Sequence, residues 1–124
     1  MANTTFTFTS KELNARERIQ LKDRSNAINI GSLVDGAENL PVIDIDYFAV
    51  LHIEPDGEDK EPFDSYIFID KNGAKYTTSS PSFWNAFFNI HQELIADGIE
   101  DMTIECYKAP CQNRQGSYLA CRLV

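Results

Sequence analysis

Apolar and polar residues alternate along several short segments of the chain, which predicts a fold built mostly of β-strands. The longest predicted strand covers 42–53, where every second residue from Ile43 to Ile53 is apolar and is expected on one face. Pro55-Asp56-Gly57 predicts a turn directly after it. Further strands are predicted over 65–70, 74–78, 102–109 and 117–123.

Lys71-Asn72-Gly73 separates two of these strands and is a strong hairpin signal, because an Asn-Gly pair readily adopts the backbone angles of a tight turn. The polar segment 110–116 separates the last two strands in the same way. Each pair of strands is therefore expected to form a hairpin.

The segment 14–30 fits two structures. Its apolar spacing would suit a short helix, whereas alternation over 16–21 suits a strand with Ile19 and Leu21 facing inward. A polar run follows in the manner of a turn after a strand, which favours the strand. Residues 27–33 are expected to continue that strand or to line a loop.

One amphipathic helix is predicted to begin after Ser80, a good N-cap residue, with Pro81 in its first turn. Two adjacent apolar stripes follow at helical spacing, one made of Phe83, Phe87, Ile90 and Leu94 and the other of Trp84, Phe88, His91 and Ile95. Asp97-Gly98 ends the predicted helix. So broad an apolar face needs a sheet or a partner to cover it.

The order of these elements predicts a mostly β fold, namely a five-stranded barrel of the oligonucleotide-binding (OB) type with one helix between strands 3 and 4. An open α+β sheet with the helix on one face is the alternative. Residues 11–124 are expected to form this single domain, and residues 1–10 a flexible N-terminal arm. Phe6 and Phe8 are expected on one face of the arm, which either frays or adds an edge strand to this barrel or to a neighbouring subunit.

Length and cysteine content refine this interpretation. A chain of 124 residues can bury a core without disulfides. The odd number of cysteines, with neither a leader peptide nor a membrane helix in the sequence, predicts a cytoplasmic protein with reduced thiols in a bacterial host cell. The spacing of Cys106, Cys111 and Cys121 does not suit a zinc site with His91, so no metal or cofactor is expected.

The net charge of −8 argues against a protein that binds phosphates, but the charges are segregated along the chain. Basic residues predominate over 11–24 and over 107–124, whereas the middle of the chain is strongly acidic. This segregation is compatible with a basic stripe on an acidic body. From charge alone, a solvated surface that keeps the protein in solution is the favoured interpretation.

The sequence contains no nucleotide-binding, hydrolase or metalloprotease motif, so neither an enzyme nor a small-molecule substrate is expected. Aromatic residues on the second faces of the predicted strands lie near basic residues of both chain ends, and single-stranded nucleic acid binds to such surfaces by base stacking and charge. The residues expected to bind single-stranded DNA are Arg16, Arg18, Lys22, Arg24, Phe48, Tyr66, Phe68, Tyr107, Lys108, Arg114, Tyr118 and Arg122.

The segments 64–69, 70–73 and 75–80, with the helix and final hairpin after them, resemble the small OB-fold single-stranded DNA-binding proteins of phages and conjugative plasmids of Gram-positive bacteria. The resemblance implies sequence-independent binding of single-stranded DNA in replication or conjugative transfer, often as a cooperative oligomer. It also adds Lys75 and Tyr76 to the expected groove. The chain ends without the acidic, glycine-rich tail of cellular homologues, so recruitment of partners through such a tail is not expected.

Two other functions fit the sequence. The acidic residues over 35–64 suit an inhibitor that mimics DNA and blocks a host nuclease. The arm and the apolar helix suit a protein-interaction module. In the second case, and in a cooperative DNA-binding protein, Phe6 and Phe8 are expected to mediate homo-oligomerisation.

Overall fold

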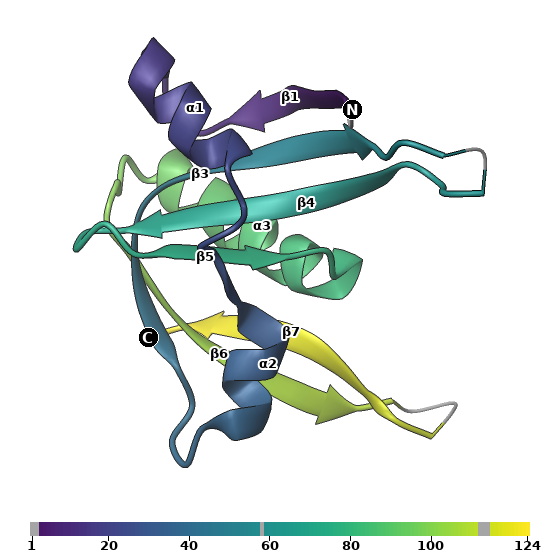
Figure 1. Ribbon diagram of the computed structural model, residues 1–124. Coiled ribbons are helices and arrows are strands. Elements are labelled where there is room, and N and C mark those ends of the chain that lie inside the picture. The colour runs from purple at the N-terminus through teal and green to yellow at the C-terminus, as the bar shows by residue number, and fades with distance from the viewer. Residues whose placement is uncertain (1–2, 58, 112–114) are drawn as a thin grey trace.

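The computed structural model describes residues 3–57, 59–111 and 115–124. Within these ranges seven strands form one curled, open sheet, and three helices lie against it (Figure 1). The elements in chain order are β1 (Asn3–Thr9), α1 (Ala15–Lys22), β2 (Ile28–Asn29), α2 (Ile30–Gly36), β3 (Val42–Glu54), β4 (Phe63–Asp70), β5 (Lys75–Thr78), α3 (Pro81–Ala96), β6 (Met102–Pro110) and β7 (Ser117–Leu123). The expectation of a mostly β, barrel-like fold is confirmed in this broad sense.

The long strand β3 lies at the centre of the sheet, whose order is β2-β5-β4-β3-β6-β7. One edge of β3 pairs with β4, while the other edge pairs first with β6 and then, further along, with β1. All these pairs are antiparallel, and only the short pair β2–β5 is parallel in the part of the chain that the structure describes. The sheet therefore curls into a half-barrel, with β2 and β7 as its two ends.

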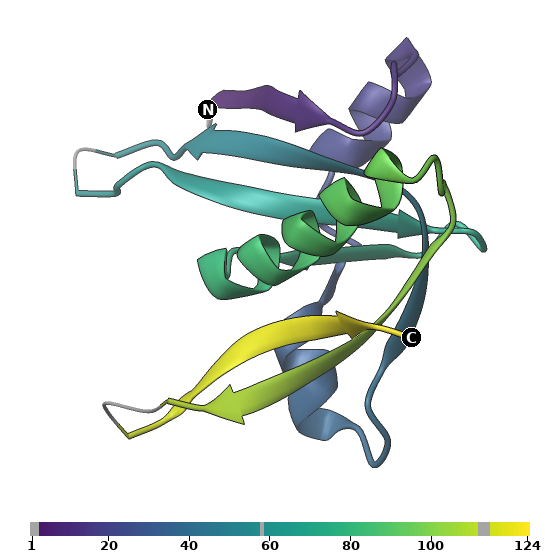
Figure 2. The same cartoon turned by 180° about the vertical axis from the view of Figure 1, so that it is seen from behind.

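Both faces of the sheet are covered, which Figure 2 shows from behind: α3 lies across one face and α1 on the other. We call the two hydrophobic clusters the α3 core and the α1 core. The buried residues of the α3 core are Ile30, Ile43, Ile45, Phe48, Val50, Tyr66, Phe68, Phe83, Phe87, Met102, Ile104, Cys106, Leu119 and Cys121. Those of the α1 core are Leu13, Leu21, Tyr47, Ala49, Leu51, Ile53, Ile67 and Ile69.

Strand β3 sends its apolar side chains to different faces in its two halves. Ile43 and Ile45 belong to the α3 core, whereas Tyr47 and the alternate residues after it belong to the α1 core. The pairing with β4 shifts register between Ile45 and Tyr47, and the extra residue of such a bulge reverses the alternation. The prediction that every second residue from Ile43 to Ile53 shares one face is therefore wrong beyond the bulge.

The N-terminal segment is an edge strand of the same sheet. Asn3–Thr9 pairs with β3. This is the edge strand that was the alternative to a flexible arm outside the domain. Its register shifts between Phe6 and Phe8, which places Phe6 beside the α1 core and Phe8 beside the α3 core. The expectation that these two rings share one face is wrong for the same reason as in β3.

The region after β1 is helical where a strand was predicted. Asn14 accepts a hydrogen bond from the backbone N–H of Glu17 at 2.8 Å, and the Glu17 carboxylate accepts one from the N–H of Asn14, which forms a capping box at the start of α1. Leu21 is fully buried, but Ile19 is 70% exposed. Only one of the two side chains predicted to face inward therefore does so.

The strongest local signals are confirmed. The hairpin at Lys71-Asn72-Gly73 joins β4 to β5, with Gly73 at φ +88° and its N–H donating to the Asp70 carbonyl at 3.0 Å. Helix α3 begins after Ser80, whose side chain accepts a hydrogen bond from the N–H of Phe83. It ends at Ala96, before Asp97 and Gly98. Phe83 and Phe87 are fully buried against the sheet, as the first apolar stripe predicts.

His91, in the second stripe of α3, makes stability depend on pH. Its ring centroid lies 4.8 Å from that of Phe48, and burial lowers the pKa of its imidazole below the ordinary value of 6.5. The unfolded chain then binds the proton first as the pH falls. Above about pH 6.5 His91 is neutral in both the folded and the unfolded chain, and its contribution to the free energy of unfolding is fully present. This contribution is lost as the pH falls from that value toward the lower pKa of the folded state.

We expect urea unfolding between pH 7.5 and pH 5.5 to show a steeper loss of stability in the wild-type protein than in a His91→Gln variant, which is neutral at both values. The carboxylates are common to both proteins, so they cancel in the comparison. Equal slopes would contradict this role of His91.

Candidate functional site

Four basic residues lie on α1 and the loop after it. Arg16, Arg18 and Lys22 are exposed on α1, and Arg24 is exposed two residues beyond its end. The sequence predicts these four as ligand-binding residues, and the structure places them within one short segment, on a helix and its following loop instead of on a strand.

These four cations differ in their partners from Lys11, Lys71, Lys108 and Arg122. In the described ranges none of them forms an ion pair, and the Arg18 guanidinium donates to the Leu13 carbonyl at 2.6 Å. Their positive charge is therefore not neutralised by a neighbouring carboxylate. The basic residues that are paired with acids are Lys11 with Glu17, Lys71 with Asp44 and Asp101, Lys108 with Asp35, and Arg122 with Glu105.

Aromatic rings lie beneath two of these cations. The Lys22 ammonium is 5.5 Å from the centroid of Phe6, and the Arg24 guanidinium is 5.4 Å from that of Phe63. Phe63 pairs with Ile53 across β3 and β4, so it leaves the sheet on the α1 side, and it is 37% exposed. We call Arg16, Arg18, Lys22, Arg24 and Phe63 the α1 surface. Phe63, which follows the acidic loop, is not among the residues predicted from the sequence.

Three rings expected in a binding groove are instead buried beneath α3. Phe48, Tyr66 and Phe68 are 2%, 7% and 0% exposed. The Tyr66 ring stacks on Trp84 with centroids 4.9 Å apart, and Phe68 meets Phe87 at 4.7 Å. The expectation that these rings face a ligand is wrong, because α3 covers the face that was taken to be open. They have no free surface on which a base could stack.

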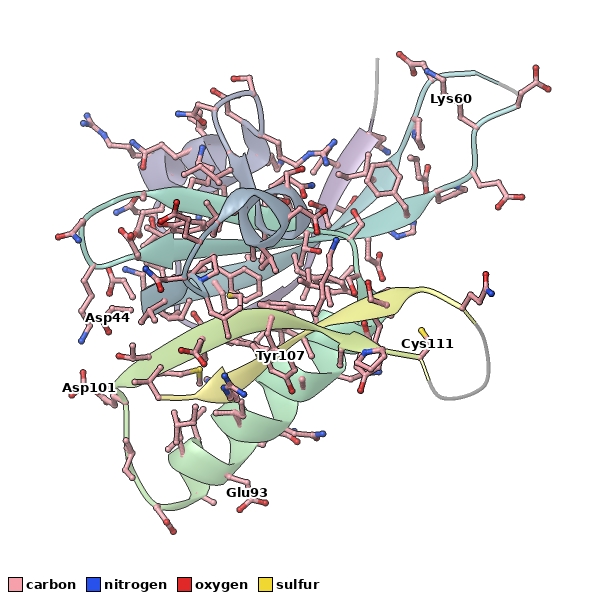
Figure 3. All side chains as sticks on the ribbon, turned by 90° about the horizontal axis from the view of Figure 1, so that it is seen from below. Asp44, Lys60, Glu93, Asp101, Tyr107 and Cys111 are labelled. Carbon is pink, nitrogen blue, oxygen red and sulfur yellow. The ribbon has the colours of Figure 1, made fainter. Side chains whose placement is uncertain are left out.

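The basic residues of the C-terminal hairpin do not join α1 in one groove. Figure 1 shows the β6–β7 hairpin and α1 at opposite ends of the molecule. Lys108 binds Asp35 at 2.8 Å. The Arg122 guanidinium donates to Glu105 at 2.7 Å and lies 4.9 Å from the centroid of Tyr107, which Figure 3 labels on this hairpin.

One further residue of the predicted groove lies at the same end. Tyr118 is 41% exposed on β7, whereas Arg114 lies outside the described residues. The groove expected from both ends of the chain is therefore not formed by the residues that can be placed.

Lys75 and Tyr76 have structural contacts. Tyr76 is half-buried against the α3 core, and burial raises the pKa of its phenol. The Lys75 ammonium donates to the carbonyl of Gln20, to that of Asp23 at 2.7 Å and to the side chain of Asn26 at 3.2 Å. Its donors are thus directed at the end of α1, so Lys75 positions the α1 surface instead of facing a ligand.

We expect Lys75→Met to lower the free energy of unfolding by about 1–2 kcal/mol, because Met keeps the aliphatic stem and removes charged hydrogen bonds to partly exposed carbonyls. Amides over 20–26 should exchange faster with deuterium. The matched control is Lys71→Met, whose ammonium binds Asp44 and Asp101 at the other end of the turn. Equal exchange over 20–26 in both variants would contradict the positioning role of Lys75.

The rings expected to mediate oligomerisation are docked within their own chain. Phe8 lies 5.8 Å from Phe48 and 5.6 Å from Phe88, between centroids. Phe6 packs against the α1 core. An intermolecular role for either ring would require β1 to leave β3, so oligomerisation through this strand remains a prediction.

Acidic side chains dominate the carboxyl end of β3, beside Phe63. Exposed Glu54, Asp59, Glu61 and Asp64 surround the β3–β4 loop, where Figure 3 labels Lys60. In the described part of the chain no group of three or more His, Cys, Asp or Glu residues is arranged to hold a metal ion. None of the described helices has both the length and the apolar composition needed to cross a membrane.

Comparison with family models, with curated proteins and with solved structures finds no match to this chain. The α1 surface therefore has to be interpreted from its own geometry.

Proposed function

We propose that this protein binds single-stranded DNA without regard to sequence, and that the phosphates contact the α1 surface. The observation that carries the proposal is the group of four exposed cations, Arg16, Arg18, Lys22 and Arg24, which form no ion pair in the described ranges. Such cations displace the counterions that are condensed on the phosphates, and this release is the main source of sequence-independent affinity.

Phe63 supplies the only exposed ring of the α1 surface, and one unpaired base can stack on it beside the Arg24 guanidinium. The exposed carboxylates of the β3–β4 loop repel phosphates and so confine the strand to α1. This mechanism differs from stacking on a sheet face, which the buried Phe48 and Phe68 do not support.

We further propose that β3 to β7 and α3 form an OB-type barrel that is open between β5 and β7. Their order is three strands, a helix and two strands, and β3 pairs with both β4 and β6. The same order is found in OB barrels. In this proposal β1, β2, α1 and α2 are additions, and α1 covers the outer face of β3 and β4. A role in replication or conjugative transfer rests on the resemblance of the sequence.

The direct test is fluorescence anisotropy of a labelled oligo-dT titrated with the protein at about 50 mM and about 300 mM salt, alongside duplex DNA and oligo-U. Electrostatic binding is strongest at the lower salt concentration. We expect micromolar or tighter affinity for oligo-dT at low salt and a marked loss at high salt. The absence of binding at low salt would refute the proposal.

The acidic inhibitor that mimics DNA is the second candidate function, because exposed carboxylates are concentrated around the β3–β4 loop. It predicts no binding to oligo-dT and a stable complex with a basic DNA-processing protein. The same titration therefore separates the two candidates.

A further inference from the structure

Cys106 and Cys121 face each other across the last hairpin. They are direct partners in the ladder between β6 and β7, and both carry free thiols. Both belong to the α3 core, with exposures of 0% and 4%. Their side chains therefore leave the hairpin on the same face and meet in the same interior.

The hydrogen bonds identify the kind of pair that these two residues form. The N–H of Cys106 donates to the Pro41 carbonyl at 2.8 Å, which points it away from β7. In an antiparallel ladder a hydrogen-bonded pair exchanges both of its bonds across the two strands, so Cys106 and Cys121 occupy a non-hydrogen-bonded position. Hydrogen-bonded and non-hydrogen-bonded pairs alternate along the ladder, so Thr103, three residues before Cys106, should belong to a hydrogen-bonded pair. Its carbonyl does accept a hydrogen bond from the Val124 N–H of β7, at 3.0 Å.

Residues at a non-hydrogen-bonded position are the closest pairs in an antiparallel sheet, with Cα atoms about 4.5 Å apart. Disulfides span Cα separations of roughly 4.4–6.8 Å. The two sulfurs can therefore bond without a change in strand register. Cys111 lies beyond the end of β6 and is no ladder partner of either residue.

We propose that Cys106 and Cys121 are an oxidation site that forms an intramolecular disulfide in exchange with a small disulfide such as oxidised glutathione. The thiolate of one cysteine attacks the small disulfide, forms a mixed disulfide and releases one glutathione thiolate. The second cysteine thiolate attacks the protein sulfur of that mixed disulfide, forms the Cys106–Cys121 bond and releases the second glutathione. Two protons pass from the cysteines to the two released thiolates, and two electrons reduce the small disulfide.

The reaction is expected to be slow in the closed hairpin. Burial raises the pKa of both thiols to about 12, so the reactive thiolate is scarce at neutral pH. Oxidation therefore requires local opening of β7, which lies at the end of the sheet. Once formed, the bond ties this end strand to β6 and opposes further opening. The redox state then sets how readily the hairpin separates.

The test is incubation of the full chain with oxidised glutathione in dilute urea, followed by acid quenching, intact mass and peptide mapping. We expect a mass lower by two hydrogen atoms and a peptide that links Cys106 to Cys121. The oxidised protein should unfold at a temperature about 5–10 °C higher than the reduced protein, because the cross-link restricts the unfolded chain.

A Cys111→Ser variant serves as the matched control, since it removes the third cysteine and leaves the pair intact. It should give the same link and the same rise in Tm, whereas Cys121→Ala should give neither. A link through Cys111, a stable glutathione adduct on both buried cysteines, or two free thiols after prolonged incubation would overturn the proposal. The mapping of the wild-type chain decides this even if the Cys121→Ala variant fails to fold.

Discussion

Replacing Arg16, Lys22 and Arg24 together by Gln is expected to weaken binding to oligo-dT by roughly 500- to 1,000-fold at about 50 mM salt. Each phosphate contact on a single strand contributes about 0.7 to the slope of log affinity against log salt. At about 50 mM salt, the loss of one such contact therefore lowers the affinity by nearly a factor of ten. Loss of three contacts should therefore also make the salt dependence shallower by about 2. Arg18 is retained because its guanidinium binds the Leu13 carbonyl.

The matched control replaces Lys71, Lys108 and Arg122 by Gln. These cations are paired with carboxylates, and the variant changes the net charge by the same three units. It should bind oligo-dT within about threefold of wild type, since paired cations release few counterions. Equal losses in both variants would show a response to total charge and would contradict a binding role of the α1 surface. Circular dichroism confirms that each variant is folded.

Phe68→Ala is expected to lower the free energy of unfolding by about 3–5 kcal/mol, the usual cost of truncating a buried phenylalanine. Phe68 is fully buried between the sheet and α3, with ring centroids 5.6 Å from Phe83 and 4.7 Å from Phe87. Removal of its ring leaves a cavity and breaks two edge-to-face contacts. For a domain of this size the loss lowers Tm by about 10–20 °C.

The control for this variant is Tyr118→Ala, because Tyr118 is an aromatic residue of β7 with 41% exposure. It should change stability by no more than about 0.5 kcal/mol. At 10 °C, the folded fraction of Phe68→Ala should bind oligo-dT as the wild type does. A specific loss of affinity in a folded Phe68→Ala protein would restore the sheet face as a binding surface. Urea unfolding and the anisotropy titration separate these outcomes.

Local signals predicted the elements that depend on local chemistry. Gly73 adopts a positive φ and Ser80 caps α3, and both effects involve only neighbouring residues. The face that each side chain occupies depends on the bulges in β1 and β3, which arise from pairing between distant segments. A regular alternation of residue types cannot reveal where such a bulge lies.

The residues of the α1 surface were predictable only in part. Arg16, Arg18, Lys22 and Arg24 are close in sequence, so any local structure would have kept them together. Phe48 and Phe68 were misplaced because a strand has two faces, and its own sequence does not show what covers the second one. A strand was preferred to a short helix over α1 because this helix buries a single side chain, Leu21, and so lacks a broad apolar stripe. The Asn14 and Glu17 capping box was the available signal.

The burial of both faces of β4 has a consequence for how this protein can diversify. Its residues from Ser65 to Ile69 are all buried, so most substitutions along this strand reduce packing and are removed by selection. The exposed positions of α1 contact little besides solvent and can change at small cost to folding. Variation in ligand preference among descendants of this chain should therefore accumulate on α1 and in the loops, while the strands beneath stay nearly constant.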